Sequence, residues 1–227
     1  MSSTSTKVDE THGDLFSFER ALRSQGFVNM VGIDEAGRGP LAGPVVAAAV
    51  RMPASWYATG LPPELEGIHD SKRLSPKKRK KLFQLLTQHS GIQFGIGVVE
   101  ADEIDVINIL KATHKAMKTA TALIVNPDPD HALVDGLPVQ GLSVPHTAIV
   151  KGDSKSYSIA AASIIAKEHR DRLMLECEAL YPEYGFAKHK GYGTAAHREA
   201  ILKHGPCPIH RDSFLGNLRQ QQILFSW

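Results

Sequence analysis

The sequence predicts an α/β fold in which helices pack on a mixed β-sheet. Short apolar runs end at glycine, proline or an acid, a pattern typical of buried strands. The first strands follow one another directly, as in an antiparallel meander, whereas the later strands alternate with helical segments. This order favours a sheet that combines antiparallel and parallel pairs and is flanked by helices.

The composition is that of a globular protein with one core. Of its 227 residues, 42% are hydrophobic and 22% are charged, and a net charge of +2 does not by itself imply nucleic acid. Two cysteines cannot form a disulfide framework, which favours a reducing compartment. No apolar segment approaches the ~20 residues that span a bilayer, and residues 1–13 lack the order of a signal peptide. We expect a cytoplasmic monomer whose residues 1–13 are disordered.

The first half of the chain contains the meander. In order, the predicted elements are a helix over residues 15–25, a strand-turn-strand unit over 27–52, a surface loop over 53–67, a helix over 76–89 and a strand over 92–99. The loop is indicated by three prolines and two glycines. Ser75 as N-cap and Pro76 at the first helical position mark the start of the second helix.

The second half alternates helices and strands. The predicted elements are helical residues 101–125 in two pieces, strands over 131–136 and 148–153, a helix over 158–180, a Gly-rich loop over 184–193 and a helix over 195–204. Asn108 divides the first helical segment, and Thr194 caps the last. Small residues give the long helix a face that can pack closely on a sheet; they are Ala160, Ala161, Ala162, Ser163 and Ala166.

Three predicted strands end in acids. Asp34 and Glu35 follow the first apolar run, and Asp135 and Asp153 follow two later ones. If these ends lie side by side, four carboxylates converge and repel one another unless cations sit among them. Two Mg²⁺ or Mn²⁺ ions about 3.5–4 Å apart can activate water and stabilise the leaving oxygen in phosphodiester hydrolysis. Because successive strand residues point to opposite faces, we expect Glu35 to lie just past the strand end.

Other interpretations of these residues are open. Each acid alone is compatible with a helix cap or a turn, but repetition at three strand ends favours a catalytic cluster. A zinc site at His204, Cys207 and His210 is a weaker metal hypothesis, because Pro206 and Pro208 stiffen the loop and a fourth ligand is missing.

Basic residues gather near one helix and one loop. The set at the helix suits phosphate binding, with a solvated helix face as the alternative; it comprises Lys72, Arg73, Lys77, Lys78, Arg79, Lys80 and Lys81. In the loop, Tyr192 between two glycines can stack on a base or sugar, or else pack under its own loop. Beside the acids, Gly37 and Gly39 allow backbone amides to approach a ribose, while Arg38 reaches a phosphate.

Taken together, these residues resemble the bacterial type 2 ribonucleases H, the ribonuclease HII family. The resemblance runs from about residue 27 to residue 214, and its first motif is highly specific. The short segment before the first strand disfavours the HIII type, which has a sizeable N-terminal domain. The matching segments, in family order, are Gly32-Ile33-Asp34-Glu35-Ala36-Gly37-Arg38-Gly39-Pro40, Asp70-Ser71-Lys72, Val134-Asp135-Gly136, Lys151-Gly152-Asp153-Ser154, Ala161-Ala162-Ser163-Ile164-Ile165-Ala166-Lys167 and His189-Lys190-Gly191-Tyr192.

The resemblance implies a ribonuclease H-like fold with a C-terminal helical extension. It also implies an endonuclease that hydrolyses the RNA strand of RNA–DNA hybrids and nicks 5′ to single ribonucleotides in duplex DNA, leaving 3′-hydroxyl and 5′-phosphate ends. Such an activity belongs to ribonucleotide excision repair and DNA replication. The implied catalytic, metal-binding residues are Asp34, Glu35, Asp135 and Asp153, with two Mg²⁺ or Mn²⁺ ions. The implied substrate contacts are Gly37, Arg38, Gly39, Lys72, Lys190 and Tyr192.

The domain organisation follows from these assignments. We expect a catalytic domain over residues 14–180, a helical substrate-binding extension over 181–219 and an apolar tail over 220–227. Within the tail, Gln221-Gln222-Ile223-Leu224-Phe225 resembles the Gln-x-x-Leu-Phe peptide that docks bacterial proteins on the replicative sliding clamp; folding back on the protein's own surface is the alternative. Two alternatives to a hybrid nuclease remain, namely another nuclease of the same fold and a non-catalytic RNA–DNA hybrid-binding module.

Overall fold

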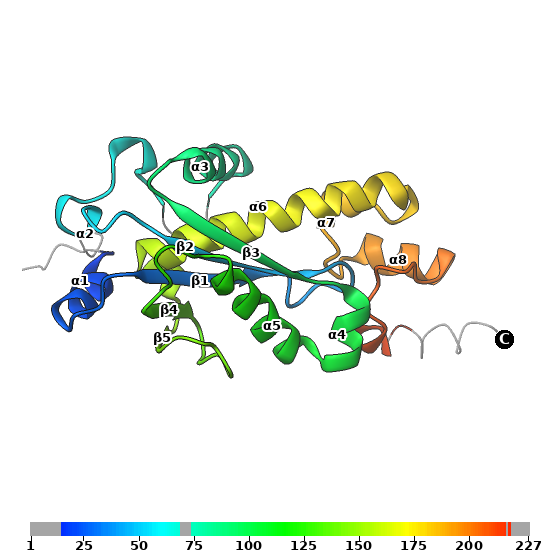
Figure 1. Ribbon diagram of the computed structural model, residues 1–227. Helices are drawn as coiled ribbons and strands as arrows, with labels where there is room; N and C mark the ends of the chain where they lie inside the picture. The colour runs from blue at the N-terminus through cyan, green and yellow to red at the C-terminus, as the bar shows by residue number, and fades with distance from the viewer. Residues whose placement is uncertain (1–14, 69–73, 217, 219–227) are drawn as a thin grey trace, which may run out of the picture.

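The chain folds around a five-stranded mixed sheet. A computed structural model describes residues 15–68, 74–216 and 218. The strands are β1 (Met30–Ala36), β2 (Val45–Arg51), β3 (Gln93–Val99), β4 (His131–Asp135) and β5 (His146–Ile149). Their order is β3-β2-β1-β4-β5, in which the first three pair antiparallel, whereas β1, β4 and β5 pair parallel (Figure 1). The predicted combination of a meander with parallel strands is confirmed.

Helices cover both faces of the sheet. The α-helices are α1 (Ser17–Ser24), α2 (Trp56–Thr59), α3 (Pro76–Gln88), α4 (Ala101–Ile107), α5 (Ile109–Ala122), α6 (Tyr157–Leu180), α7 (Phe186–His189) and α8 (Ala195–His204). Short 3₁₀-helices are η1 (Pro63–Leu65), η2 (Gly152–Ser154), η3 (Pro182–Tyr184) and η4 (Asp212–Phe214). The helices α6 and α3 pack on one face, and α4 and α5 on the other (Figure 1). In the described ranges no helix is long and apolar enough to cross a membrane.

Local sequence signals set several helix ends. The side chains of Ser75 and Thr194 each accept the backbone N–H three residues further on, at the starts of α3 and α8. Asn108 has a φ of 68° and separates α4 from α5, and its side chain accepts the first backbone N–H groups of α5. The predicted caps and the predicted break are therefore confirmed. Each such cap contributes about 1 kcal/mol.

Two segments that were expected to be loops contain helices. Residues 53–67 form α2 and η1 and bury Tyr57, which is 1% exposed. Pro63 occupies the first position of η1, where no N–H is needed, so a proline-rich sequence is compatible with this helix. Residues 184–193 contain α7, whose Phe186 is fully buried. In both segments an aromatic side chain anchors the chain to a core, a tertiary effect that turn residues do not reveal.

Arg79 is a correction to the predicted basic face of α3. Instead of pointing to solvent, it is 8% exposed and bridges α3 to α6. Its Nε lies 2.6 Å from Glu168 Oε1, and its Nη2 lies 3.3 Å from Asp171 Oδ2. Two carboxylates from α6 offset the cost of burying the guanidinium, and the remaining lysines of α3 form the exposed basic set.

The C-terminal elements have an apolar cluster of their own. It lies between the end of α6, the residues after β1 and the helices α7 and α8, and it includes Ala42, Met174, Tyr184, Phe186, Ile201 and Leu215. The predicted boundary after residue 180 coincides with the end of α6. The predicted disordered segment at residues 1–13 and the tail at 220–227, including the segment that resembles a clamp-docking peptide, lie outside the described residues.

A very close helix–sheet contact lies where α6 crosses β1. As the small face of α6 predicts, residues 160–166 are buried in this interface. A Cβ atom at Gly32 would lie 2.1 Å from the backbone carbon of Ser158, which is far inside van der Waals contact. Only glycine therefore allows α6 to approach the centre of the sheet this closely.

We expect Gly32→Ala to destabilise the protein, because the added methyl group must displace the α6 backbone. The loss should be about 1–3 kcal/mol of unfolding free energy, the usual range for an overpacked core, measured by urea denaturation. The matched control is Gly216→Ala, where nothing lies within 4 Å of the added carbon. Equal stability of the two variants would contradict this account of the interface.

Candidate active site

Sheet topology brings the predicted acids to one edge. Strands β1, β4 and β5 run parallel, so their C-terminal ends lie next to one another. Asp34 and Glu35 are both inside β1, where they pair with residues of β2, and Asp135 is the last residue of β4. The expectation that Glu35 lies just past the strand end is wrong. The strand continues regularly to Ala36, and the two acids therefore point to opposite faces of the sheet.

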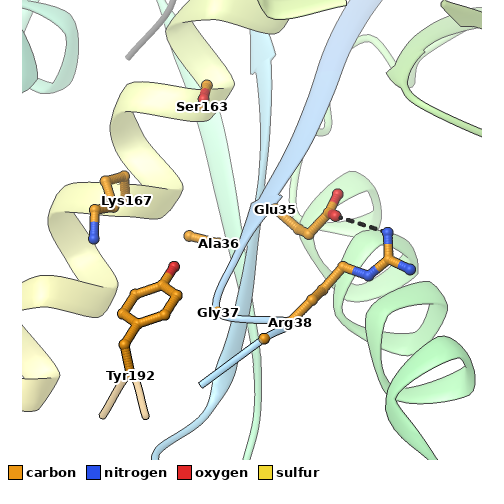
Figure 2. A pocket seen from close by; sticks show the side chains of 8 residues that line it. Glu35, Ala36, Gly37, Arg38, Ser163, Lys167 and Tyr192 are labelled. Carbon is orange, nitrogen blue, oxygen red and sulfur yellow. Dashed lines mark hydrogen bonds and ion pairs between the residues drawn. The ribbon is translucent and has the colours of Figure 1, made fainter. Parts of the chain in front are cut away.

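The two faces give Asp34 and Glu35 different surroundings. Asp34 is 3% exposed and hydrogen-bonds to the Ser163 side chain of α6. Glu35 is half-buried on the other face, and its Oε1 lies 3.2 Å from Arg38 Nη1. Figure 2 shows Glu35 and Arg38 on one side of β1, with Ser163 and Lys167 of α6 on the other. The end of β1 therefore offers a carboxylate on each side of the sheet edge.

Asp153 reaches this edge from beyond its strand. The prediction that it ends a strand is wrong, because β5 ends at Ile149 and Asp153 lies in η2. Lys151, with a φ of 56°, turns the chain between them. The Gly152 N–H then donates to Asp135 Oδ1 over 2.6 Å, which ties η2 to the end of β4. Asp153 is 6% exposed in this position.

Three of the four acids, Asp34, Glu35 and Asp135, interact electrostatically. The pKa of Asp34 is raised well above its ordinary value, mainly because burial disfavours the charged form and further because of the charges of Glu35 and Asp135. Hydrogen bonds from Ser163 and from the Glu35 backbone N–H act in the opposite direction. A nearby cation would stabilise the ionised carboxylate and so offset both the burial and the neighbouring charges, which means that the electrostatics of this edge favour cation binding.

The donor chemistry fits a hard divalent ion, because all four predicted ligands are carboxylates. In the residues that the structure describes, however, no three Asp, Glu, His or Cys side chains are grouped closely enough to form a preassembled metal site. This also disfavours the zinc hypothesis. In that loop Cys207 Sγ contacts His210 Nδ1 at 3.1 Å, but the same nitrogen already accepts the Cys207 N–H.

A cavity of about 270 Å³ adjoins the acids at the end of β1 (Figure 2). It is lined by Glu35, Ala36, Gly37, Arg38, Gly39, Ser163, Lys167 and Tyr192. Gly37 has a φ of 97°, and a Cβ there would meet the Arg170 side chain at 2.1 Å. The Gly-Arg-Gly turn thus presents backbone to the cavity, with a carboxylate, a lysine and a tyrosine around it.

Two buried arginines hold this turn from behind. Arg211 is fully buried and donates to the carbonyl oxygens of Gly37, Arg38, Pro40 and Gly43 at 2.6–3.1 Å. Arg170, also fully buried, donates to those of Ala42, Pro44 and Lys190. Burial lowers the pKa of Arg211 to about 9, with the Arg170 charge as the second cause. These guanidinium groups join α6 and the C-terminal extension to the residues after β1.

A chain of histidines supports Tyr192 from below. The Cys207 N–H donates to His210 Nδ1, which leaves the His210 Nε2–H to donate to His197 Nε2 at 3.0 Å. The His197 Nδ1–H then donates to the Tyr192 carbonyl oxygen at 3.0 Å. Burial lowers the pKa of both histidines, that of His197 to about 4, which favours their neutral forms. The Tyr192 side chain itself is 44% exposed, which confirms that it does not pack under its loop.

Of the two lysines predicted to contact substrate, Lys190 is described by the structure and Lys72 is not. Lys190 lines a second cavity of about 510 Å³ between α3, α6 and α7, together with Lys80, Lys167 and Lys188. Its Nζ donates to the Ala187 carbonyl oxygen, and its backbone has a φ of 51°. Lys72 lies outside the described residues. The structure therefore brings Lys190 next to Tyr192 on a basic surface.

Sequence reasoning missed four residues of this site. Ser163 and Lys167 were part of a matched motif without an assigned role, and their spacing of four on α6 places them on one helix face. No local signal distinguishes Arg170 and Arg211 from surface arginines, because their partners are carbonyl groups far away in the sequence.

Comparisons with known proteins agree with this arrangement. A family model described as Ribonuclease HII matches residues 31–216. Proteins named Ribonuclease HII from Geotalea uraniireducens and Geobacter sulfurreducens are 53% identical over 207 residues and 52% identical over 202 residues. The alignments cover 91% of this chain and 92% of the first relative, and 89% of this chain and 89% of the second. The crystal structure of ribonuclease H2 from Pyrococcus horikoshii OT3 has a TM-score of 0.71 at 27% identity, covering 87% of this chain and 99% of that one.

The raised pKa of Asp34 predicts a pH-dependent stability. A folded-state pKa above the unfolded value means that ionisation of Asp34 opposes folding. The stability that the protein has with Asp34 protonated is therefore lost as the pH rises through the folded-state pKa. In chelator, Asp34→Asn should therefore unfold at a higher temperature than the wild type at neutral pH. The difference should shrink as the pH falls through the raised folded-state pKa and should vanish below the ordinary value of 3.8, where Asp34 is protonated in both states. Exposed Asp128→Asn is the control, and an Asp34→Asn variant that is less stable at neutral pH would contradict the assignment.

Proposed function

Since the chain belongs to the ribonuclease HII family, we propose that it hydrolyses the RNA strand of RNA–DNA hybrids and nicks duplex DNA 5′ to single embedded ribonucleotides. A hydrolase of the ribonuclease H type is the established part of this statement. The preference for a lone ribonucleotide is the proposed part. The observation that carries it is the position of the Gly-Arg-Gly turn, which lines one cavity together with Glu35 and Tyr192.

In this proposal Asp34, Glu35, Asp135 and Asp153 hold two Mg²⁺ or Mn²⁺ ions. When bound, such ions activate a water molecule for attack on the phosphorus and stabilise the leaving 3′-oxygen. The protein contributes a buried carboxylate ligand, Asp34, whose ionisation is disfavoured until a cation offsets its burial and the neighbouring charges. The Gly152 N–H keeps Asp135 oriented toward the same edge. The products carry 3′-hydroxyl and 5′-phosphate ends.

Recognition of the ribose falls to the turn beside the acids. The 2′-hydroxyl is the group that distinguishes RNA from DNA at a given nucleotide. Backbone N–H groups of residues 37–39 approach it closely because Gly37 and Gly39 carry no side chain. Arg38, whose side chain is 52% exposed, contacts a neighbouring phosphate. Cleavage thus depends on a ribose placed next to the metal ligands.

The nucleotide that follows the ribose is held by Tyr192. Its exposed ring stacks on the sugar, and Lys167 and Arg170 lie 5.9 Å from the ring centroid on the protein side. Lys190 and the exposed lysines of α3 contribute positive charge to the phosphate backbone nearby. This division assigns specificity to the turn and Tyr192, and general affinity to the lysines.

The test is a labelled DNA duplex with one ribonucleotide, beside an all-DNA duplex, in Mg²⁺, Mn²⁺ or chelator. We expect one metal-dependent nick 5′ to the ribonucleotide. We also expect Asp34→Asn to reduce the rate by at least about a hundredfold, the scale on which loss of one preorganised charge acts. Cleavage of the all-DNA duplex would indicate another nuclease of this fold. Tight binding without cleavage would indicate a hybrid-binding module.

Arg38→Ala and Tyr192→Ala should lower kcat/KM for the single-ribonucleotide duplex by about 10-fold or more, the value of one stacked base or charged contact. Long RNA–DNA hybrids offer many alternative registers, so their cleavage should fall less. The matched variants are Tyr192→Phe, which keeps the ring, and Arg23→Ala on the exposed face of α1. Equal losses on both substrates would contradict a junction-specific role.

A further inference from the structure

The buried side chain of Arg211 forms hydrogen bonds to the backbone of the Gly-Arg-Gly turn. Its guanidinium is 0% exposed and spans the Gly-Arg-Gly turn, with 2.6 Å from Nη2 to Gly37 O and 3.1 Å from Nη1 to Arg38 O. In the described part of the chain no carboxylate forms an ion pair with it. All of its side-chain hydrogen bonds go to carbonyl oxygens; the Phe214 ring lies 5.2 Å from the guanidinium, and the charge of Asp105 stabilises it from a longer distance. A buried cation held mainly in this way is costly, and its position needs a reason beyond packing.

The geometry of the peptide unit supplies that reason. In a planar trans peptide the C=O and the N–H of the next residue point in opposite directions. When Arg211 draws the Gly37 and Arg38 carbonyl oxygens to the buried side, the N–H groups of Arg38 and Gly39 must point away from it. Neither N–H donates to an acceptor among the described residues. Both belong to residues that line the cavity beside the acids.

We infer that Arg211 is a positioning residue for ribose recognition, which holds the Arg38 and Gly39 N–H groups as a pair of donors aimed into the cavity. The inference rests on the proposed function and identifies the Arg211 guanidinium as the group that orients the turn for ribonucleotide recognition. Arg211 also polarises the two peptide units, because a cation at a carbonyl oxygen strengthens the donor at the other end of the same amide. The acceptor that fits two convergent N–H groups here is a sugar hydroxyl oxygen.

The C-terminal extension thereby becomes part of the recognition site. Arg211 comes directly before η4, whose first backbone N–H groups, those of Asp212 and Ser213, donate to Asp105 of α4. The Arg211 N–H donates to the Leu41 carbonyl oxygen at 2.8 Å, and the Gly43 N–H donates to Ile209. These contacts leave Arg211 little freedom, so the donors are set before substrate arrives.

The experiment measures binding in the Asp34→Asn background, in Mg²⁺, with a single-ribonucleotide duplex and an all-DNA duplex as fluorescent probes. Arg211→Lys keeps the charge but cannot span both carbonyl groups. We expect the preference for the ribonucleotide duplex, the ratio of the two Kd values, to fall on the order of tenfold, as the loss of aligned donors implies. Leu86→Ala destabilises the core of α3 without touching the turn, and it should keep the ratio.

The outcomes separate this inference from the proposed function. Wild-type nicking with an unchanged Kd ratio in Arg211→Lys would overturn the inference alone, whereas wild-type protein that does not cut would overturn the function on which it rests. If Arg211→Lys does not fold, amide NMR spectra of the folded Asp34→Asn protein decide. The Arg38 and Gly39 N–H signals should shift with the ribonucleotide duplex and not with all-DNA duplex, and unshifted signals would refute the inference.

Discussion

The close approach of α6 to β1 is the contact on which the candidate site depends. Gly32 allows the helix backbone to reach the centre of the sheet, and residues further along α6 then meet the end of the same strand. Ser163, Lys167 and Arg170 follow at steps of four and three, so they project from one helix face. They hydrogen-bond to the buried carboxylate, line the cavity and support the turn, respectively. One helix–strand contact therefore places three functional side chains.

Two groups of like charges lie close together at the candidate site, the carboxylates at the sheet edge and the buried arginines behind the turn. At the acidic edge, carboxylates approach one another and burial raises the pKa of Asp34. A few residues further on, burial lowers the pKa of two guanidinium groups, those of Arg170 and Arg211, and the Arg170 charge lowers the pKa of Arg211 further. Carbonyl oxygens stabilise these cations, whereas Asp34 remains next to the negative charges of Glu35 and Asp135. The result is an edge that attracts cations beside a turn that is held rigid.

The residues after α6 contribute to the candidate site mainly by holding the backbone around the cavity in place. Their own apolar cluster fixes α7 and α8. Their polar groups reach back toward the sheet, because Arg211 contacts the residues after β1 and the His197–His210 pair holds the Tyr192 carbonyl oxygen. Burial lowers the pKa of both histidines, so their neutral forms, which suit this hydrogen-bonded chain, are favoured. Residues on both sides of the cavity are thus supported by elements that follow α6, and the family match, over residues 31–216, includes these elements.

Local sequence determined the element order, the caps at Ser75 and Thr194, the break at Asn108 and the identity of the acids, because these depend on neighbours within a few residues. The tertiary structure decided the rest. In the folded chain Glu35 lies inside β1 and Asp153 lies in η2 rather than at a strand end. Arg79 and Arg211 are buried. Burial of a charged group depends on partners distant in the chain, such as carbonyl oxygens 168 to 174 residues away from Arg211. No local pattern carries that information, and only the folded chain supplies it.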